Sequence, residues 1–211
     1  MSPAELLERA PGVGGGLPGA ALPHRGDGDG DSGPSRRVIN RFGLWLVLAT
    51  LSMMFIGFTS AYVVRRAAAD WVALPFPSVL VWNTLALLAS SVFLERSRRA
   101  LQSWDLPGAQ RWLAVTGALG ALFAGGQTVA WRQLAGMGVF LSSNPHSSFF
   151  YLLTGVHLAH LAFGLWWFAA SFIRLRRMAY APGEDGLGLF AVYWHFLGAL
   201  WAYLLVVLYV L

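Results

Sequence analysis

Five long runs of apolar residues, separated by short polar segments, dominate the chain. Each run is close to the roughly 20 residues that an α-helix needs to cross a bilayer. The runs are solidly apolar, whereas the strands of a membrane barrel alternate polar and apolar residues. Because lipid offers no partner to open backbone groups, the runs predict helices. We therefore expect an all-α fold, a polytopic membrane helix bundle with five transmembrane helices, over about residues 42–64, 78–94, 112–134, 148–173 and 187–211.

Residues 1–37 differ from the rest of the chain. They contain nine of the 24 glycines and five of the ten prolines, and they include an alternating Gly/Asp run at residues 26–31. Such a segment cannot bury enough apolar surface to offset its conformational entropy. It also lacks the apolar core of a signal peptide. We expect a disordered, Gly/Pro/Asp-rich cytoplasmic tail over 1–37 and a membrane domain over 38–211.

The arginines predict the orientation of the helices. Basic residues are enriched in cytoplasmic loops, and this bias sets the topology of a membrane protein. We therefore expect the N-terminus in the cytoplasm and the C-terminus outside, as five spans require. The predicted inner side carries Arg36, Arg37, Arg41, Arg96, Arg98, Arg99, Arg111, Arg174, Arg176 and Arg177, and the outer side carries Arg65, Arg66 and Arg132.

Composition narrows the class of protein. The chain is 56% hydrophobic and 12% charged, whereas a soluble domain carries about 25% charged residues. There are no cysteines, which excludes disulfides, thiolate metal sites and cysteine nucleophiles. The net charge of +5 would indicate nucleic-acid binding in a soluble protein. Here the arginines lie between apolar runs, so we expect no nucleic-acid partner.

Small and polar residues recur at helical spacing within each run. Lipid provides no hydrophobic drive between helices, so such residues mark helix–helix contacts. The opposite faces, rich in Leu, Val and Phe, are expected to meet lipid or an apolar partner. The residues expected at contacts are Gly43, Thr50 and Gly57 in the first run, Asn83, Thr84, Ser90, Ser91 and Glu95 in the second, Gly117, Gly120, Ala124, Gln127 and Trp131 in the third, Thr154, His157, His160 and Gly164 in the fourth, and Ala191, His195, Gly198 and Ala202 in the fifth.

Three histidines are the main candidates for chemistry. His157 and His160 share a helical face, and His195 lies one predicted helix later. Three imidazoles could bind zinc, copper or a haem iron, which would make the chain an independent metal or haem membrane protein. No carboxylate lies in mid-membrane to serve as a second shell. The alternative is that each histidine hydrogen-bonds to a neighbouring helix.

The other polar groups indicate structure rather than catalysis. Glu95 ends the second run beside three arginines, and we expect it to form an ion pair at the membrane interface. A transporter would need a chain of ionisable groups through the bilayer. The deep parts of the runs hold only Gln127, hydroxyls and the three histidines. The segment Asn144-Pro145-His146 has the composition of a turn.

Short motifs occur in order along the five runs. Residues 154–160 read TGVHLAH, with a glycine at 164, and residues 193–196 read YWHF, with a tryptophan at 201. Residues 83–91 read NTLALLASS. Further matches are Trp45, Phe55, Gly57 and Tyr62 in the first run, and Gly120, Phe123, Gln127 and Trp131 in the third. Together these motifs resemble subunit III of haem-copper terminal oxidases, the cytochrome c oxidase polypeptide III, in its five-helix form.

This resemblance implies a non-catalytic accessory subunit of a cytochrome c oxidase in aerobic respiration. Such a subunit packs on the catalytic subunit I, works in a complex that includes subunit II, and binds phospholipid. Haem and copper are then expected in the partner subunits, and no cofactor, catalytic residue or metal ligand is expected in this chain. The implied location is a bacterial cell (inner) membrane. The residues to which the resemblance gives a lipid-binding or helix-packing role are His157, His160, His195, Trp131, Gln127, Thr154, Ser90, Ser91 and Glu95.

Two positions depart from the family pattern. Many relatives have a membrane-embedded Glu where this chain has Leu51, and an Asp where it has Gly198. Both changes remove a carboxylate and argue against a role in proton handling. The sequence leaves open a quinol oxidase or a nitric oxide reductase-associated homologue as the host complex, as well as the independent metal or haem protein described above.

Overall fold

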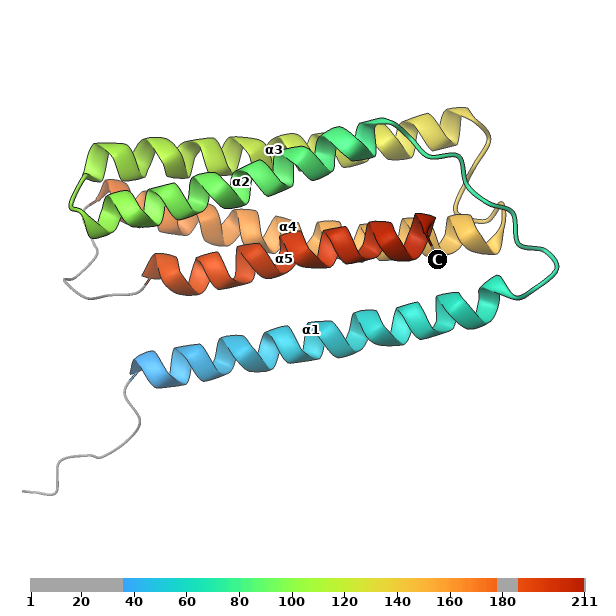
Figure 1. Ribbon diagram of the computed structural model, residues 1–211, viewed down its shortest axis with the longest axis horizontal. Coiled ribbons are helices and arrows are strands. Elements are labelled where there is room, and N and C mark those ends of the chain that lie inside the picture. Colours follow the sequence, from blue (N-terminus) through green and yellow to red (C-terminus); the bar gives the residue numbers. More distant parts are fainter. Residues whose placement is uncertain (1–35, 178–185, 211) are drawn as a thin grey trace, which may run out of the picture. The chain divides into compact units, whose positions relative to one another are not determined.

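The structure is a computed structural model that describes residues 36–177 and 186–210. Within these residues it contains five helices and no strand, and each helix is long and apolar enough to cross a membrane. The predicted all-helical membrane bundle is therefore confirmed. Residues 1–35 of the predicted tail lie outside the described residues. The helices are α1 (Arg36–Arg66), α2 (Val79–Gln102), α3 (Leu106–Gly136), α4 (Pro145–Arg176) and α5 (Gly186–Tyr209), as labelled in Figure 1.

Most helices extend beyond the apolar runs from which they were predicted. α2 continues to Gln102, past its expected end at residue 94, and α3 begins at Leu106 instead of residue 112. The reason is that backbone hydrogen bonds continue along a helix whatever the polarity of its side chains, so charged turns lengthen it. Only three residues join α2 to α3. Of these, Asp105 caps α3 by accepting a hydrogen bond from the Gly108 amide at 3.0 Å.

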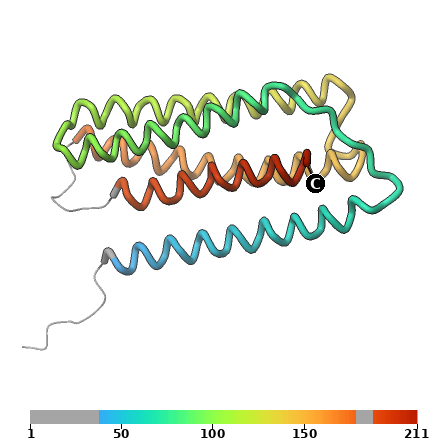
Figure 2. Tube along the Cα trace, in the orientation of Figure 1, coloured from blue at the N-terminus to red at the C-terminus, as the bar shows by residue number. Residues whose placement is uncertain are grey.

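The five helices form three layers. α2 and α3 run antiparallel in one layer, α4 and α5 lie beneath them, and α1 lies on the far side of α4 and α5 (Figures 1 and 2). α2 contacts α3 and α5, α3 contacts α4, and α1 contacts only α4 and α5. The C-terminal end of the bundle is the end at which α5 finishes. The N-terminal end of the bundle is the end at which α1 begins.

The contact face of α1 differs from the one expected. Gly43, Thr50 and Gly57 are exposed, and a side chain added at either glycine would meet nothing within 4 Å. The prediction that these small residues mark a contact is wrong. The buried stripe of α1 consists instead of large side chains at helical spacing, on the face that meets α4 and α5. These side chains are Leu44, Leu48, Leu51, Phe55 and Tyr62.

The start of α4 also corrects a prediction. Asn144-Pro145-His146 is not a turn but the beginning of a helix. The Asn144 side chain accepts a hydrogen bond from the Ser147 amide at 3.0 Å, and the Ser147 hydroxyl accepts one from the Asn144 amide at 3.1 Å. Pro145 occupies the first helical position, where its missing N–H costs nothing. This capping box fixes where α4 begins.

Candidate functional site: buried and exposed polar groups

Three tryptophans connect neighbouring helices through hydroxyl groups. The Trp194 indole N–H donates to Ser90 Oγ at 2.9 Å, and the Trp131 indole N–H donates to Thr154 Oγ1 at 3.1 Å. The Trp201 indole N–H donates in the same way to Thr84 Oγ1 at 3.0 Å. These bonds join α5 to α2 and α3 to α4. Ser90, Thr154 and Trp131, all expected site residues, thus lie at contacts between helices.

Gln127 and His157 lie in the interior of the bundle. Both are fully buried. The His157 ring packs against those of Phe123 and Trp201, with centroid distances of 5.9 and 5.2 Å. The side-chain polar atoms of Gln127 and His157 have no hydrogen-bond partner. Because protein atoms cover both residues completely, neither can reach a lipid that lies around the bundle.

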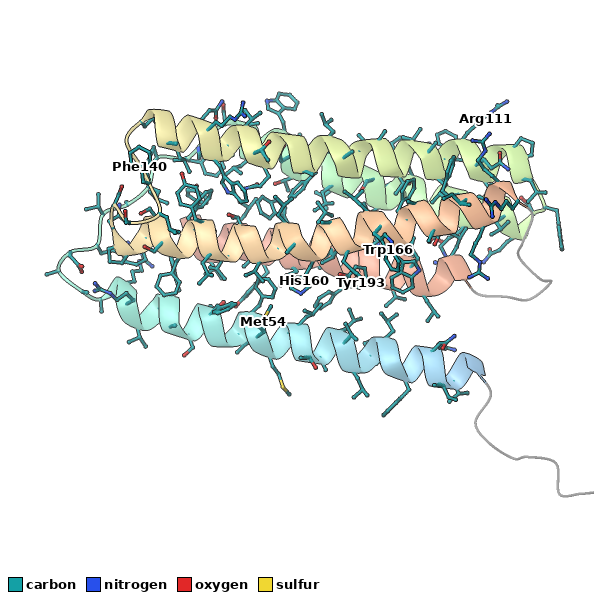
Figure 3. All side chains as sticks on the ribbon, turned by 180° about the vertical axis from the view of Figure 1, so that it is seen from behind. Met54, Arg111, Phe140, His160, Trp166 and Tyr193 are labelled. Atoms are coloured by element: carbon teal, nitrogen blue, oxygen red, sulfur yellow. The ribbon has the colours of Figure 1, made fainter. Side chains whose placement is uncertain are left out.

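His160 lies three residues after His157 on α4, at the edge of the same face, and is directed toward α1. Figure 3 shows it beside Tyr193, with Met54 of α1 nearby. Its Nδ1 is 2.7 Å from the Val156 carbonyl, and its ring lies 6.2 Å from that of Phe55. The Tyr193 hydroxyl donates to the His160 carbonyl at 3.0 Å. His160 is therefore part of the contact between α4, α5 and α1.

Ser91, Glu95 and His195 come together on the outer face of the α2–α5 seam. A side chain added at Gly198 of α5 would lie 3.6 Å from Ser91 Oγ, so the two helices are close at this point. One turn away, exposed His195 lies within electrostatic reach of Glu95. Glu95 pairs with Arg98 at 2.9 Å and with Arg99 at 3.6 Å. We call Ser91, Glu95, Arg98 and His195 the seam cluster.

The three histidines do not form a shared site. His157 is in the core, His160 lies toward α1, and His195 is on the seam. Among the residues that the structure describes, no three His, Asp or Glu side chains could hold a metal ion together. The geometry therefore does not support a metal site that uses all three of these histidines together.

His146 is a buried polar residue that the sequence interpretation missed. Its Nδ1 accepts a hydrogen bond from the Leu74 amide at 3.2 Å, and its Nε2 lies 3.1 Å from the Leu208 carbonyl. This pattern requires a neutral ring protonated at Nε2. The Trp71 ring stacks on it at 4.7 Å. His146 thus ties the α1–α2 connection and the end of α5 to the start of α4. The capping pattern at residues 144–147 could have shown that a helix begins there and that His146 belongs to it.

Comparison with known proteins places this arrangement in a family. The family model for cytochrome c oxidase subunit III matches residues 37–211. The chain belongs to the cytochrome c oxidase subunit III family. It is 31% identical over 204 residues to cytochrome c oxidase subunit 3 of Synechocystis sp., covering 92% of this chain and 81% of that protein. It is 32% identical over 187 residues to the Thermostichus vulcanus protein of the same name, covering 84% and 89%.

More distant relatives bear the same name. Cytochrome c oxidase subunit 3 of Bacillus sp. is 27% identical over 188 residues, which are 82% of this chain and 86% of that protein. The expected membership of the subunit III family is thereby confirmed, and with it the interpretation of the chain as an accessory oxidase subunit.

The two positions at which this subunit III lacks a carboxylate both lie at helix contacts. Leu51 is buried in the stripe through which α1 meets α4 and α5. Gly198 is buried where α5 approaches Ser91 of α2. An uncharged small residue at 198 allows α2 and α5 to approach closely. In this chain the two positions contribute to packing.

Proposed function

We propose that the chain packs on the catalytic subunit I of a cytochrome c oxidase in a bacterial inner membrane and that the seam cluster lies within this interface. Subunit II is expected in the same complex, and haem and copper in the partner subunits. The observation that carries the proposal is the exposure of the seam cluster. Glu95 and Arg98 keep 37% and 28% of their side-chain surface exposed, and they lie within a membrane-spanning helix.

Exposed polar groups at this position are costly in lipid. Ionisable side chains within transmembrane segments are rare, and they face protein or water where they occur. Glu95 directly follows the apolar run of α2, so it lies where the membrane-spanning part of the helix gives way to its charged last turns. A protein partner with polar groups satisfies the cluster better than acyl chains do.

Apolar side chains beside the cluster complete the proposed interface. Leu88 and Val92 of α2 are 50% and 56% exposed, and Val192 of α5 is 40% exposed. Interfaces between permanently associated chains combine such apolar area with a few placed polar groups. The α2–α5 face has both components.

The relatives and the arginines support two further parts of the proposal. The relatives described above are named for cytochrome c oxidase, which favours cytochrome c over quinol as the electron donor of the host complex. The excess of arginines at the N-terminal end of the bundle favours a cytoplasmic N-terminus and an external C-terminus. We also propose that the chain holds phospholipid, as the resemblance implies. Buried Gln127, His157, Ser90 and Thr154 then serve packing alone.

Purification of the oxidase in mild detergent tests the proposed interface. Val92→Trp places a bulky side chain on the proposed interface. Val129→Trp, at a 44% exposed position on α3, is the matched control. We expect the wild type and the control to retain a haem-containing partner and Val92→Trp to lose most of it. Equal retention by both variants would overturn the α2–α5 interface. Isolation of the wild type without any haem-containing partner would overturn the proposed assembly itself.

A further inference from the structure

A groove with a volume of about 500 Å³ lies near the C-terminal end of the bundle, outside the seam cluster. It is formed by the last turns of α3, the α3–α4 connection and α4. Its lining residues are Thr128, Trp131, Arg132, Ala135, Phe140, Leu141 and Tyr151. Phe140 and Leu141 are 57% and 59% exposed. The groove is therefore mostly apolar and contains one charged residue.

The aromatic walls of the groove are held in place by hydrogen bonds. The Tyr151 hydroxyl donates to the Val139 carbonyl at 2.9 Å, and the Trp131 indole N–H donates to Thr154 Oγ1. The Trp131 and Tyr151 rings lie 6.2 Å apart. Neither ring has to rearrange to admit a ligand, so binding costs little conformational entropy.

Arg132 provides an unneutralised positive charge at this groove. It is exposed, and no carboxylate in the described part of the chain pairs with its guanidinium. It lies four residues before the end of α3 at Gly136, which is roughly 6 Å along the helix. A side chain at this depth extends its charged group to the headgroup region and lays its aliphatic part along apolar surface.

We propose that this groove binds one glycerophospholipid, with an acyl chain against Trp131, Leu141 and Tyr151 and the phosphodiester on the Arg132 guanidinium. Arginine forms two parallel hydrogen bonds to phosphate oxygens. Tryptophan and tyrosine are enriched at the same membrane depth. This inference rests on the proposed phospholipid-holding role and assigns that role to residues that the sequence interpretation did not include.

The test compares two arginines on the same helix. Arg132→Gln removes the charge at the groove, and Arg111→Gln removes a charge that is also exposed, at the opposite end of α3. Figure 3 labels Arg111 and, near the groove, Phe140. The oxidase is purified from each strain, and bound phosphatidylglycerol is titrated and counted by mass spectrometry. A basic residue near the surface contributes about 1 kcal/mol toward an anionic lipid, which corresponds to a roughly fivefold weaker affinity in Arg132→Gln.

Each outcome decides the proposal. A fivefold loss in Arg132→Gln, none in Arg111→Gln, and partial recovery in Arg132→Lys, which restores the charge but not the paired hydrogen bonds, supports it. Equal lipid content and affinity in all three variants and the wild type would overturn the assignment of a lipid site to this groove. It would leave open that the chain holds lipid elsewhere. No bound phospholipid in the wild type would overturn the lipid-holding role as well. A neutral galactolipid should bind all forms alike, and a loss of that lipid in Arg132→Gln would show that the phosphate is not what Arg132 recognises.

Discussion

α1 and α5 have nearly the same hydropathy, but α1 lies at the outside of the bundle and α5 lies in its interior. The most apolar 18-residue stretches of α1 and α5 have mean hydropathies of 1.9 and 1.8. Yet 22% of this stretch is buried in α1, whereas 56% of it is buried in α5. α5 contacts α1, α2 and α4, whereas α1 contacts only α4 and α5. Hydropathy therefore indicates that a helix is in the membrane, but not how deeply it lies within the protein. Aromatic side chains with hydroxyl partners distinguish α5 from α1.

The largest expected effect comes from removing such a side chain from α5. Trp194 is fully buried and donates to Ser90 Oγ. Trp194→Ala leaves a cavity and an unpaired hydroxyl, so we expect a loss of about 3–5 kcal/mol in the free energy of unfolding. Trp45→Ala on α1, where the side chain is 62% exposed, should change it by less than about 0.5 kcal/mol. Reversible unfolding in detergent measures both, and equal losses would remove the distinction between the two helices.

A smaller effect is expected where the Trp194 ring of α5 packs against Gly120 of α3. A Cβ at Gly120 would lie 2.7 Å from the Trp194 ring, and one at Gly57 of α1 would meet nothing within 4 Å. Gly120→Ala should therefore destabilise the bundle by about 1–3 kcal/mol through overpacking. Gly57→Ala should be neutral or slightly stabilising, because alanine favours the helix. The midpoints of thermal unfolding compare the two variants, and a stable Gly120→Ala protein would contradict the packing of the Trp194 ring against Gly120.

α1 is linked to α5 by two hydrogen bonds from tyrosines. The Tyr62 hydroxyl donates to the Leu208 carbonyl at 3.4 Å, and the Tyr203 hydroxyl donates to Thr59 Oγ1 at 2.9 Å. Tyr62→Phe removes the buried bond and keeps the ring contacts, so the expected loss is about 0.5–1.5 kcal/mol. Tyr203→Phe, at an exposed position, should cost less. The same unfolding measurement ranks them, and the reverse order would mean that the exposed bond holds α1.

The smallest expected effect concerns the segment that follows α1. Arg65 pairs with Asp70 through two hydrogen bonds of 2.8 and 2.6 Å, and this pairing lowers the pKa of Asp70. A lowered pKa in the folded state means that the pair stabilises the fold at pH values above the pKa of Asp in the unfolded chain, which is about 3.9. This contribution is lost as the pH falls through the lower, folded value.

Carbon-13 NMR of the Asp70 carboxyl checks this pair. Arg65→Gln should return the pKa of Asp70 toward about 3.9, and Arg66→Gln is the matched control. An unchanged titration in Arg65→Gln would show that the pair does not form in the membrane-embedded protein.

The fold was predictable because a membrane helix is specified by its own composition. The bounds of α2 were less predictable, since its charged last turns continue a helix without being apolar. Within the site, Ser90, Gln127 and Thr154 were predicted at contacts because polar groups avoid lipid. His195 was placed among the same contacts by its spacing, yet it is exposed, because periodicity identifies a face and not the element that covers it.

The face of α1 could not be predicted from small residues. Close backbone approach requires glycine or alanine, but helices that are farther apart meet through large side chains such as Phe55 and Tyr62. Arg132 was read as a topology signal only. Its groove depends on the α3–α4 connection folding back beside α3, which no local pattern in α3 encodes.

The attachment of α1 to only α4 and α5 has a consequence for biosynthesis. α1 leaves the ribosome first among the five helices, but its packing stripe has no partner until α4 is made. Roughly 80 residues separate the end of α1 from the start of α4, which at roughly 5–20 residues per second is on the order of 4–16 s of translation. During that interval lipid, or another membrane protein, must cover Leu48, Leu51 and Phe55. The first helix to enter the membrane is thus among the last to find its place in the bundle.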